Sequence, residues 1–145
     1  MFKHILLPTD GSPVSETAIR RGVEFARSLG ARITGFYVVP EFHVFTYRTS
    51  TRPDAQEEVA RDARAHADRY LGLIEQTARA AGVDCATAYA TGDQPYEAII
   101  KAAGTHGCDV IVMASHGRRG VQGLLLGSET HKVLTHSKIP VLVFR

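Results

Sequence analysis

Residues 109–128 read DVIVMASHGRRGVQGLLLGS: a short apolar run, a glycine-rich loop, and a serine that opens a more polar stretch. The run from Asp109 to Met113 is continuous and rich in β-branched residues, which is typical of a strand buried on both faces of a parallel sheet. Glycines allow the loop backbone to turn and bring its N–H groups close to an anion. We expect Ser128 to cap a helix whose positively polarised N-terminus faces that anion. The segment therefore predicts a strand, a phosphate-binding loop and a helix in succession.

The same succession recurs along the chain. Residues 5–7 form an apolar run that ends at Pro-Thr-Asp-Gly-Ser, and Ser12 and Pro13 then provide a helix N-cap with proline in the first turn. Gly30 and Gly82 stand where glycines commonly end helices. The whole pattern predicts strands at 5–7, 32–39, 83–90, 109–113 and 140–144, and helices at about 13–29, 54–81, 95–103 and 128–136. The core-facing stripe of the helix 54–81 is expected to contain Val59, Ala63, Tyr70, Ile74 and Ala78.

Strands that alternate with helices over the whole chain predict an α/β fold: an open five-stranded parallel sheet with helices on both faces, of the Rossmann-like kind. The length of 145 residues and the hydrophobic content of 44% suit one domain over residues 1–145. In such sheets a ligand binds beyond the carboxyl ends of the strands, where the strand order reverses. The segments 8–12, 38–40 and 114–128 each follow a strand, so we expect them at that end.

The charges and cysteines exclude several classes of protein. The 17 basic and 15 acidic residues are mixed along the chain and give a formal net charge of +2, so no broad basic surface for nucleic acid or membrane lipid is expected. Cys85 and Cys108 stand apart in apolar contexts, which favours reduced thiols over a disulfide. The apolar run near the N-terminus is too short for a signal peptide or a membrane span. We therefore expect a soluble, cytoplasmic protein.

The motifs of efficient hydrolases are missing from the sequence. It contains neither the Gly-Lys-Ser/Thr of a P-loop nor a Gly-x-Ser-x-Gly elbow around Ser115. His131 and His136 are five residues apart and so fall on different faces of a helix, and His116 has no partner at metal-ligand spacing. The histidines therefore favour structural or solvated roles over a metal site, and rapid ATP hydrolysis is not expected.

A glycine spacing late in the chain carries a family resemblance. Gly117 is followed by nine residues and then by Gly127 and Ser128, and the chain continues with Ser-Glu-x-x-x-Val-Leu and Pro-Val-Leu-Val. In these features and in the order of its elements, the sequence resembles the universal stress protein family over essentially its full length. The nucleotide-binding branch of that family carries Gly-x-x-Gly, nine residues, then Gly-Ser or Gly-Thr. Ala114 stands at the first glycine position here, and alanine still allows a close backbone approach where φ is negative.

The resemblance implies a fold like that of the adenine nucleotide alpha hydrolases, with a bound ligand. That ligand is ATP or a related adenine nucleotide, with Mg²⁺ or Mn²⁺ accompanying the phosphates. Asp10 matches the acidic residue near the ribose and phosphates, and Val38 matches the position whose backbone contacts adenine. The expected binding residues are Pro8, Thr9, Asp10, Val38, Met113, Ala114, His116, Gly117, Arg118, Gly120, Gly127, Ser128 and Glu129.

Several of these positions also have plain structural interpretations. Asp10 before Gly-Ser is typical of an Asx turn or a helix cap, and adjacent arginines such as Arg118 and Arg119 are more often solvated than bound to phosphate. For the whole protein, the leading hypothesis is a nucleotide-dependent binding or regulatory module with an unknown protein partner. The alternatives are an interaction protein of the same family that binds no nucleotide, and a slow hydrolase with Asp10 as its base.

Two further expectations concern segments outside the binding loops. Residues 141–144 are all apolar, and as an exposed edge strand they would need a partner. The resemblance implies a homodimer in which the two final strands pair antiparallel across a two-fold axis. Residues 41–53 are long for a connection and mix aromatic with basic side chains, which suggests a lid that becomes ordered with ligand.

Overall fold

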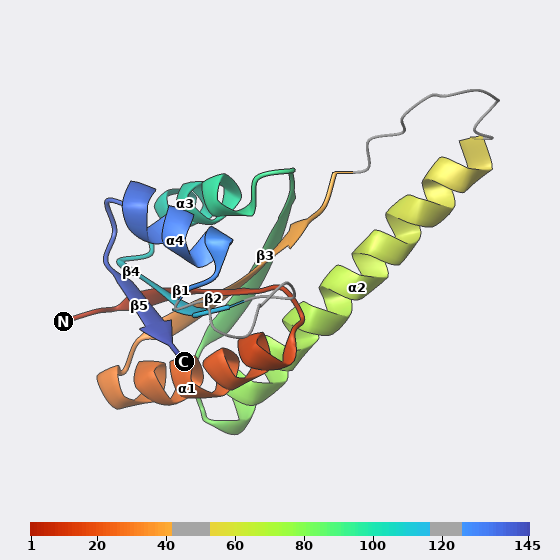
Figure 1. Ribbon diagram of the computed structural model, residues 1–145. Helices are drawn as coiled ribbons and strands as arrows, with labels where there is room; N and C mark the ends of the chain where they lie inside the picture. The colour runs from red at the N-terminus through yellow and green to blue at the C-terminus, as the bar shows by residue number, and fades with distance from the viewer. Residues whose placement is uncertain (42–52, 117–125) are drawn as a thin grey trace.

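The computed structural model describes residues 1–41, 53–116 and 126–145 (Figure 1). Its strands are β1 (His4–Thr9), β2 (Arg32–Val39), β3 (Cys85–Thr91), β4 (Val110–Ala114) and β5 (Val141–Phe144). Its helices are α1 (Pro13–Leu29), α2 (Pro53–Ala80), α3 (Pro95–Thr105) and α4 (Ser128–His136). The predicted alternation of strands and helices is confirmed. The predicted lid falls almost wholly outside the described residues, as does most of the glycine-rich loop.

All five strands belong to one parallel sheet in the order β3-β2-β1-β4-β5. In the register of β1, His4 lies opposite Arg32 of β2 and Ile5 lies opposite Val110 of β4. The chain therefore adds β2 and β3 on one side of β1, and it later adds β4 and β5 on the other side. This confirms the open five-stranded parallel sheet, and it puts the reversal of strand order, where ligands bind in such sheets, between β1 and β4.

The alternation of side chains along the strands builds one core on each face of the sheet. Ile5 and Leu7 pack with residues of α1 and α2, whereas Leu6 packs on the opposite face with residues of α3 and α4. Figure 1 shows the same division of the helices between the two faces. All three side chains are 0% exposed, so the burial of each contributes about 1.5–3 kcal/mol of hydrophobic stabilisation.

Local signals set the ends of α1 and α2 as predicted. Ser12 is the N-cap of α1, and its hydroxyl accepts a hydrogen bond from the Ser15 N–H at 3.2 Å. Gly30 and Gly82 follow these helices with left-handed φ values of 62° and 69°. Glycine adopts this conformation without a Cβ penalty, so both residues end a helix at little cost.

The start of α4 differs from the prediction by one residue. The expectation that Ser128 caps this helix is wrong, because Gly127 is the N-cap, with φ −68° and ψ 152°, and Ser128 is the first helical residue. The Gly127 carbonyl already accepts the first helical hydrogen bond, from the His131 N–H at 2.9 Å, which defines the cap position.

Helix α2 is longer than the part of the sheet that it covers. Leu71, Ile74 and Ala78 are buried in the core, while the side chains of residues 56–62 are all exposed. Figure 1 shows this N-terminal part extending away from the sheet. The expectation that Val59 faces the core is therefore wrong: its side chain is 37% exposed because the helix has passed the edge of the sheet.

Both cysteines have free thiols, as expected from their spacing. Burial raises the pKa of the Cys108 thiol to about 11, so this group stays protonated and unreactive at neutral pH. Among the helices described, none is long and apolar enough to cross a membrane.

A buried histidine joins β1 to β2 at the amino end of the sheet. His4 is 7% exposed, and its Nε2 lies 2.8 Å from the Thr34 Oγ1. Its Nδ1 makes no hydrogen bond of sound geometry within the described residues. Burial, aided by the Arg32 guanidinium, lowers the pKa of His4, while Asp109 and the Gly107 carbonyl act more weakly in the opposite direction. The folded protein therefore favours the neutral imidazole.

We expect the protein to lose stability as the pH falls below 6.5, the ordinary pKa of histidine. Because the folded-state pKa of His4 is lowered, the unfolded chain takes up its proton first, and the free energy of unfolding falls as the pH drops toward the folded-state pKa. His4→Gln cannot gain this proton, so its free energy of unfolding should fall less. Urea unfolding at about pH 7.5 and about pH 5.5 measures the difference.

The matched control is His131→Gln, because His131 is exposed on α4. This variant should follow the natural protein at both pH values. Equal losses of stability in the natural protein and in His4→Gln would contradict the assignment to His4.

Candidate functional site

The turn between β1 and α1 is closed by its own side chains. The Gly11 N–H donates to the Thr9 Oγ1 at 3.1 Å, and the Ser12 N–H donates to the Asp10 Oδ1 at 2.9 Å. The Asp10 N–H donates to the Ser15 Oγ at 3.2 Å. Asp10 thus forms an Asx turn, one of the two interpretations that its sequence context left open. The turn follows β1, so it also holds the Asp10 carboxylate at the carboxyl edge of the sheet.

The end of β4 is joined to the start of α4. The Thr130 Oγ1 donates to the Ala114 carbonyl at 2.9 Å, and the Gly127 N–H donates to the Ser115 carbonyl at 2.7 Å. The Ser115 N–H extends the sheet by donating to the Phe144 carbonyl at 2.8 Å. These bonds bring the first turn of α4 onto the end of β4, at the same edge as the Asp10 turn.

Helices α1, α3 and α4 all begin at this edge, but their N-termini are satisfied differently. The Ser12 hydroxyl caps α1. The Gln94 side chain makes no cap on α3, and the Glu129 Oε2 instead accepts from the Tyr96 N–H at 2.9 Å. Gly127 has no side chain with which to cap α4, and no side chain of the described residues caps it instead. Of these three helices, α4 alone has an N-terminus that makes no hydrogen bond to a described side chain, and the partial positive charge there suits an anion.

Glu129, an expected binding residue, is engaged with the neighbouring helix. One carboxylate oxygen accepts from the Tyr96 N–H, and the other lies 3.2 Å from the Lys132 Nζ. A negative charge at the N-terminus of α3 is favourable because of the helix dipole. The structure thus gives Glu129 a role in joining α3 to α4.

Glu129→Ala is expected to lower the free energy of unfolding by about 1 kcal/mol, the usual cost of a lost helix cap. Glu129→Gln keeps an acceptor but not the charge, so its loss should be smaller. Urea unfolding measures both changes. Glu57→Ala, which breaks only an exposed ion pair with Arg61 on α2, is the control and should change stability little. A Glu129→Ala protein as stable as this control would rule out the capping role.

The remaining expected residues lie at different depths. Pro8 is buried in β1, and Met113 is buried in the core between the sheet and the α3 and α4 helices. Val38 is half-buried on the same face, in β2, which β1 separates from β4. His116 follows β4, and its Nδ1 lies 2.9 Å from the Ser115 Oγ. Three expected residues lie outside the described part of the chain: Gly117, Arg118 and Gly120.

Three residues that shape this edge were not among the expected site residues: Ser15, Thr130 and Tyr70. Ser15 and Thr130 occupy the third helical position after their N-caps, and each hydroxyl bonds back to the strand or turn before its helix. A hydroxyl at that position is a signal that the sequence does carry. Tyr70 packs against Gly11 from α2, and no local pattern indicates a contact between such distant segments.

Two hollows of about 400 Å³ each lie away from this edge. One is lined by Lys3, Arg27 and Arg32, among others, near the amino ends of the strands, and the other lies between α1 and α2. Neither includes a residue of the Asp10 turn or of α4. In the described ranges, no group of three His, Cys, Asp or Glu side chains is placed to hold a metal ion. The candidate site is therefore defined by the hydrogen-bonded Asp10 turn and by the N-terminus of α4.

Solved structures share this fold. The structure of MJ0577 from Methanocaldococcus jannaschii superposes with a TM-score of 0.83 at 29% sequence identity, over 99% of this chain and 95% of that chain. A universal stress protein in complex with cAMP has a TM-score of 0.73 at 23% identity, over 99% and 97% of the two chains. A universal stress protein family protein from Arabidopsis thaliana with AMP bound has a TM-score of 0.69 at 16% identity, over 98% and 90%.

Sequence comparison agrees with the structural likeness. The universal stress protein YxiE of Bacillus subtilis is 30% identical over 149 residues, a match that spans all of both chains. The family model described as the universal stress protein family matches residues 1–145. This chain therefore belongs to the universal stress protein family.

Proposed function

We propose that this protein binds ATP or a related adenine nucleotide at the carboxyl edge of β1 and β4, and that it acts as a nucleotide-dependent regulatory module for an unknown protein partner. The N-terminus of α4, which no described side chain caps, is the observation that carries the proposal. The bonds made by Thr130 and Gly127 hold this helix end at the edge that also carries Asp10. A phosphate group there accepts hydrogen bonds from the N–H groups and is stabilised by the helix dipole.

In this proposal each part of the nucleotide has a chemically suitable neighbour. The phosphates lie against Gly127 and Ser128, the ribose lies near Asp10, and the adenine lies near Val38. Mg²⁺ or Mn²⁺ prefers oxygen ligands, and Asp10 supplies the anionic side chain of the turn. With no three-residue cluster for a metal in the described part of the chain, the phosphate oxygens would supply the larger share of the ligands.

Ala114, which replaces the first glycine of the family pattern, is compatible with a bound nucleotide. It is the last residue of β4 and therefore has the extended backbone that any residue adopts. Its carbonyl is occupied by the Thr130 hydroxyl. The position thus makes no demand for a left-handed backbone that only glycine would meet easily.

The nucleotide-bound relatives support the class of ligand. One is in complex with cAMP and the other has AMP bound. We favour ATP with a divalent cation because this edge combines a helix end for phosphate with a carboxylate for the cation. The cytoplasmic location expected from the cysteines stays a prediction.

Calorimetry with ATP and Mg²⁺, on protein freed of carried-over ligand, tests the proposal. Ser128→Ala removes a hydroxyl beside the phosphates and is expected to weaken binding about fivefold, since one hydrogen bond contributes about 1 kcal/mol. Ser28→Ala removes an exposed hydroxyl in the last turn of α1 and should leave the affinity unchanged. If the natural protein binds no adenine nucleotide at millimolar concentration, the proposal fails and the interaction-protein alternative replaces it.

We also propose that two copies pair through β5, an edge strand of the sheet. The Ile111 N–H donates to the Pro140 carbonyl, and successive residues of a strand direct their backbone groups to alternate sides. The N–H and C=O groups of Val141 and Val143 therefore face away from β4. All four residues of β5 are apolar and half-buried, so antiparallel pairing with a second β5 would satisfy the backbone groups and cover the strand.

Light scattering at micromolar concentration is expected to show a dimer. Val143→Pro removes an outward N–H and should shift the protein toward monomer, because proline is tolerated on an edge strand but cannot donate to a neighbour. Val143→Ala shortens the side chain but keeps the N–H, so this control should remain a dimer. A monomeric mass for the natural protein would refute the pairing.

A further inference from the structure

The ring of Tyr70 packs directly on the backbone of Gly11. Gly11 lies in the turn after β1 and has a left-handed φ of 77°. A side-chain carbon built on Gly11 would overlap the Tyr70 ring, so the ring fills the space that a larger residue would need. Glycine is therefore required at this position both by the backbone and by the ring.

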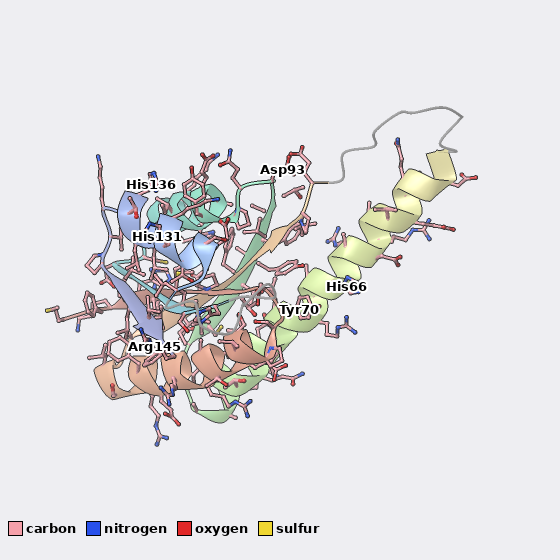
Figure 2. The ribbon with its side chains drawn as sticks, in the orientation of Figure 1. His66, Tyr70, Asp93, His131, His136 and Arg145 are labelled. Carbon is pink, nitrogen blue, oxygen red and sulfur yellow. The ribbon has the colours of Figure 1, made fainter. Side chains whose placement is uncertain are left out.

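Other side chains fix the ring of Tyr70 in place. The Tyr37 ring of β2, which is buried, lies 5.3 Å away at an angle of 57°. The His66 ring, one turn earlier on α2, lies 6.2 Å away at 27°, and the Arg69 guanidinium lies 5.5 Å from the Tyr70 ring centre. Figure 2 shows His66 and Tyr70 next to each other along α2. Aromatic and cation–π contacts of this geometry stabilise one orientation of the ring.

Tyr70 lies in the part of α2 that packs on the core, which already includes the buried Ala67 three residues earlier. The residues after it, such as Leu71 and Ile74, are buried in the core, whereas residues 56–62 are exposed. In Figure 1 the N-terminal part of α2 extends beyond the sheet. A side chain from the core-packed part of α2 therefore contacts the Asp10 turn.

We propose that Tyr70 is a positioning residue for the nucleotide site: its ring holds Gly11, and through Gly11 it holds the turn that presents Asp10. This inference rests on the proposed function. Without the ring, the space beside Gly11 is open and the turn is held by its own hydrogen bonds, so it samples more conformations before a ligand binds. Pre-organisation by the ring lowers the entropy that nucleotide binding would otherwise lose. By reciprocity, a bound nucleotide that stabilises the turn also stabilises the contact between Gly11 and Tyr70.

Binding measurements with two variants test whether nucleotide affinity depends on the aromatic ring of Tyr70. In calorimetry with ATP and Mg²⁺, Tyr70→Leu, which keeps an apolar side chain but loses the aromatic face, is expected to weaken affinity about tenfold. Tyr70→Phe keeps the ring and should bind within about twofold of the natural protein. The matched control is Leu73→Ala, one turn along the same helix and exposed, which should leave the affinity unchanged.

Amide hydrogen exchange of the ligand-free protein gives a second readout that needs no nucleotide. The Gly11 and Ser12 N–H groups are hydrogen-bonded within the turn, and their exchange should become several-fold faster in Tyr70→Leu but not in Tyr70→Phe or Leu73→Ala. Unchanged exchange in Tyr70→Leu would overturn the positioning of the turn, and faster exchange with unchanged ATP affinity would overturn its role in binding. If the natural protein binds no nucleotide, the proposed function fails and the site role of Tyr70 fails with it, while exchange still decides whether Tyr70 holds the turn.

Discussion

The parallel pairing of β1 with β4 is the contact on which the rest of the molecule depends. Next to the paired residues Ile5 and Val110, the Asp109 carboxylate accepts hydrogen bonds from the Lys3 and His4 N–H groups, at 2.8 and 3.1 Å. These bonds hold the starts of the two strands together. This pairing joins segments about 105 residues apart in the sequence. Because the strands are parallel, the turn after β1 and the segment after β4 then emerge at the same edge. The reversal of strand order, and with it the candidate site, exists only once this pair has formed.

The hydrogen bonds at that edge decide which helix end is available to a ligand. Each helix N-terminus has N–H groups that need acceptors. Ser12 supplies one for α1, and Glu129 reaches from the first turn of α4 to supply one for α3. Glu129, which stabilises the N-terminus of α3, thus belongs to α4. No described side chain caps the N-terminus of α4 itself. The proposed binding site and the stability of the fold are linked here, because the same turn of α4 joins two helices and presents its N–H groups at the edge of the sheet.

The Asp10 turn and the end of β4, which form the candidate site, are each held by a hydrogen bond to the helix beside them. Ser15 and Thr130 lie at equivalent positions in α1 and α4, and each fixes the backbone that precedes its helix. On the α2 side, the Tyr70 ring closes the space next to Gly11. In the described part of the candidate site, these contacts hold the backbone in place without a ligand, which would lower the entropic cost of the proposed binding.

The sequence by itself determined the features that depend on neighbouring residues. The strand 32–39 and the helix 128–136 coincide with β2 and α4, and the cap at Ser12 and the stop at Gly30 lie where their local signals predicted them. The helix and strand preferences of neighbouring residues also predicted the alternation of strands and helices, which in turn predicted a parallel α/β sheet. Even the error at the start of α4 is local, since a glycine and a serine side by side are both acceptable caps.

Only the tertiary structure decided the features that depend on distant residues. The order of the strands, the reach of Glu129 to Tyr96, the Tyr70 ring on Gly11 and the exposure of Val59 were not predicted. A stripe of apolar residues says which face of a helix is apolar, but not where the sheet beneath it ends. Likewise, the position of Glu129 in the first turn of its own helix does not indicate that a second helix lies within its reach. Backbone preferences and side-chain periodicity act within a few residues, whereas these contacts depend on which elements the pairing of the strands brings together.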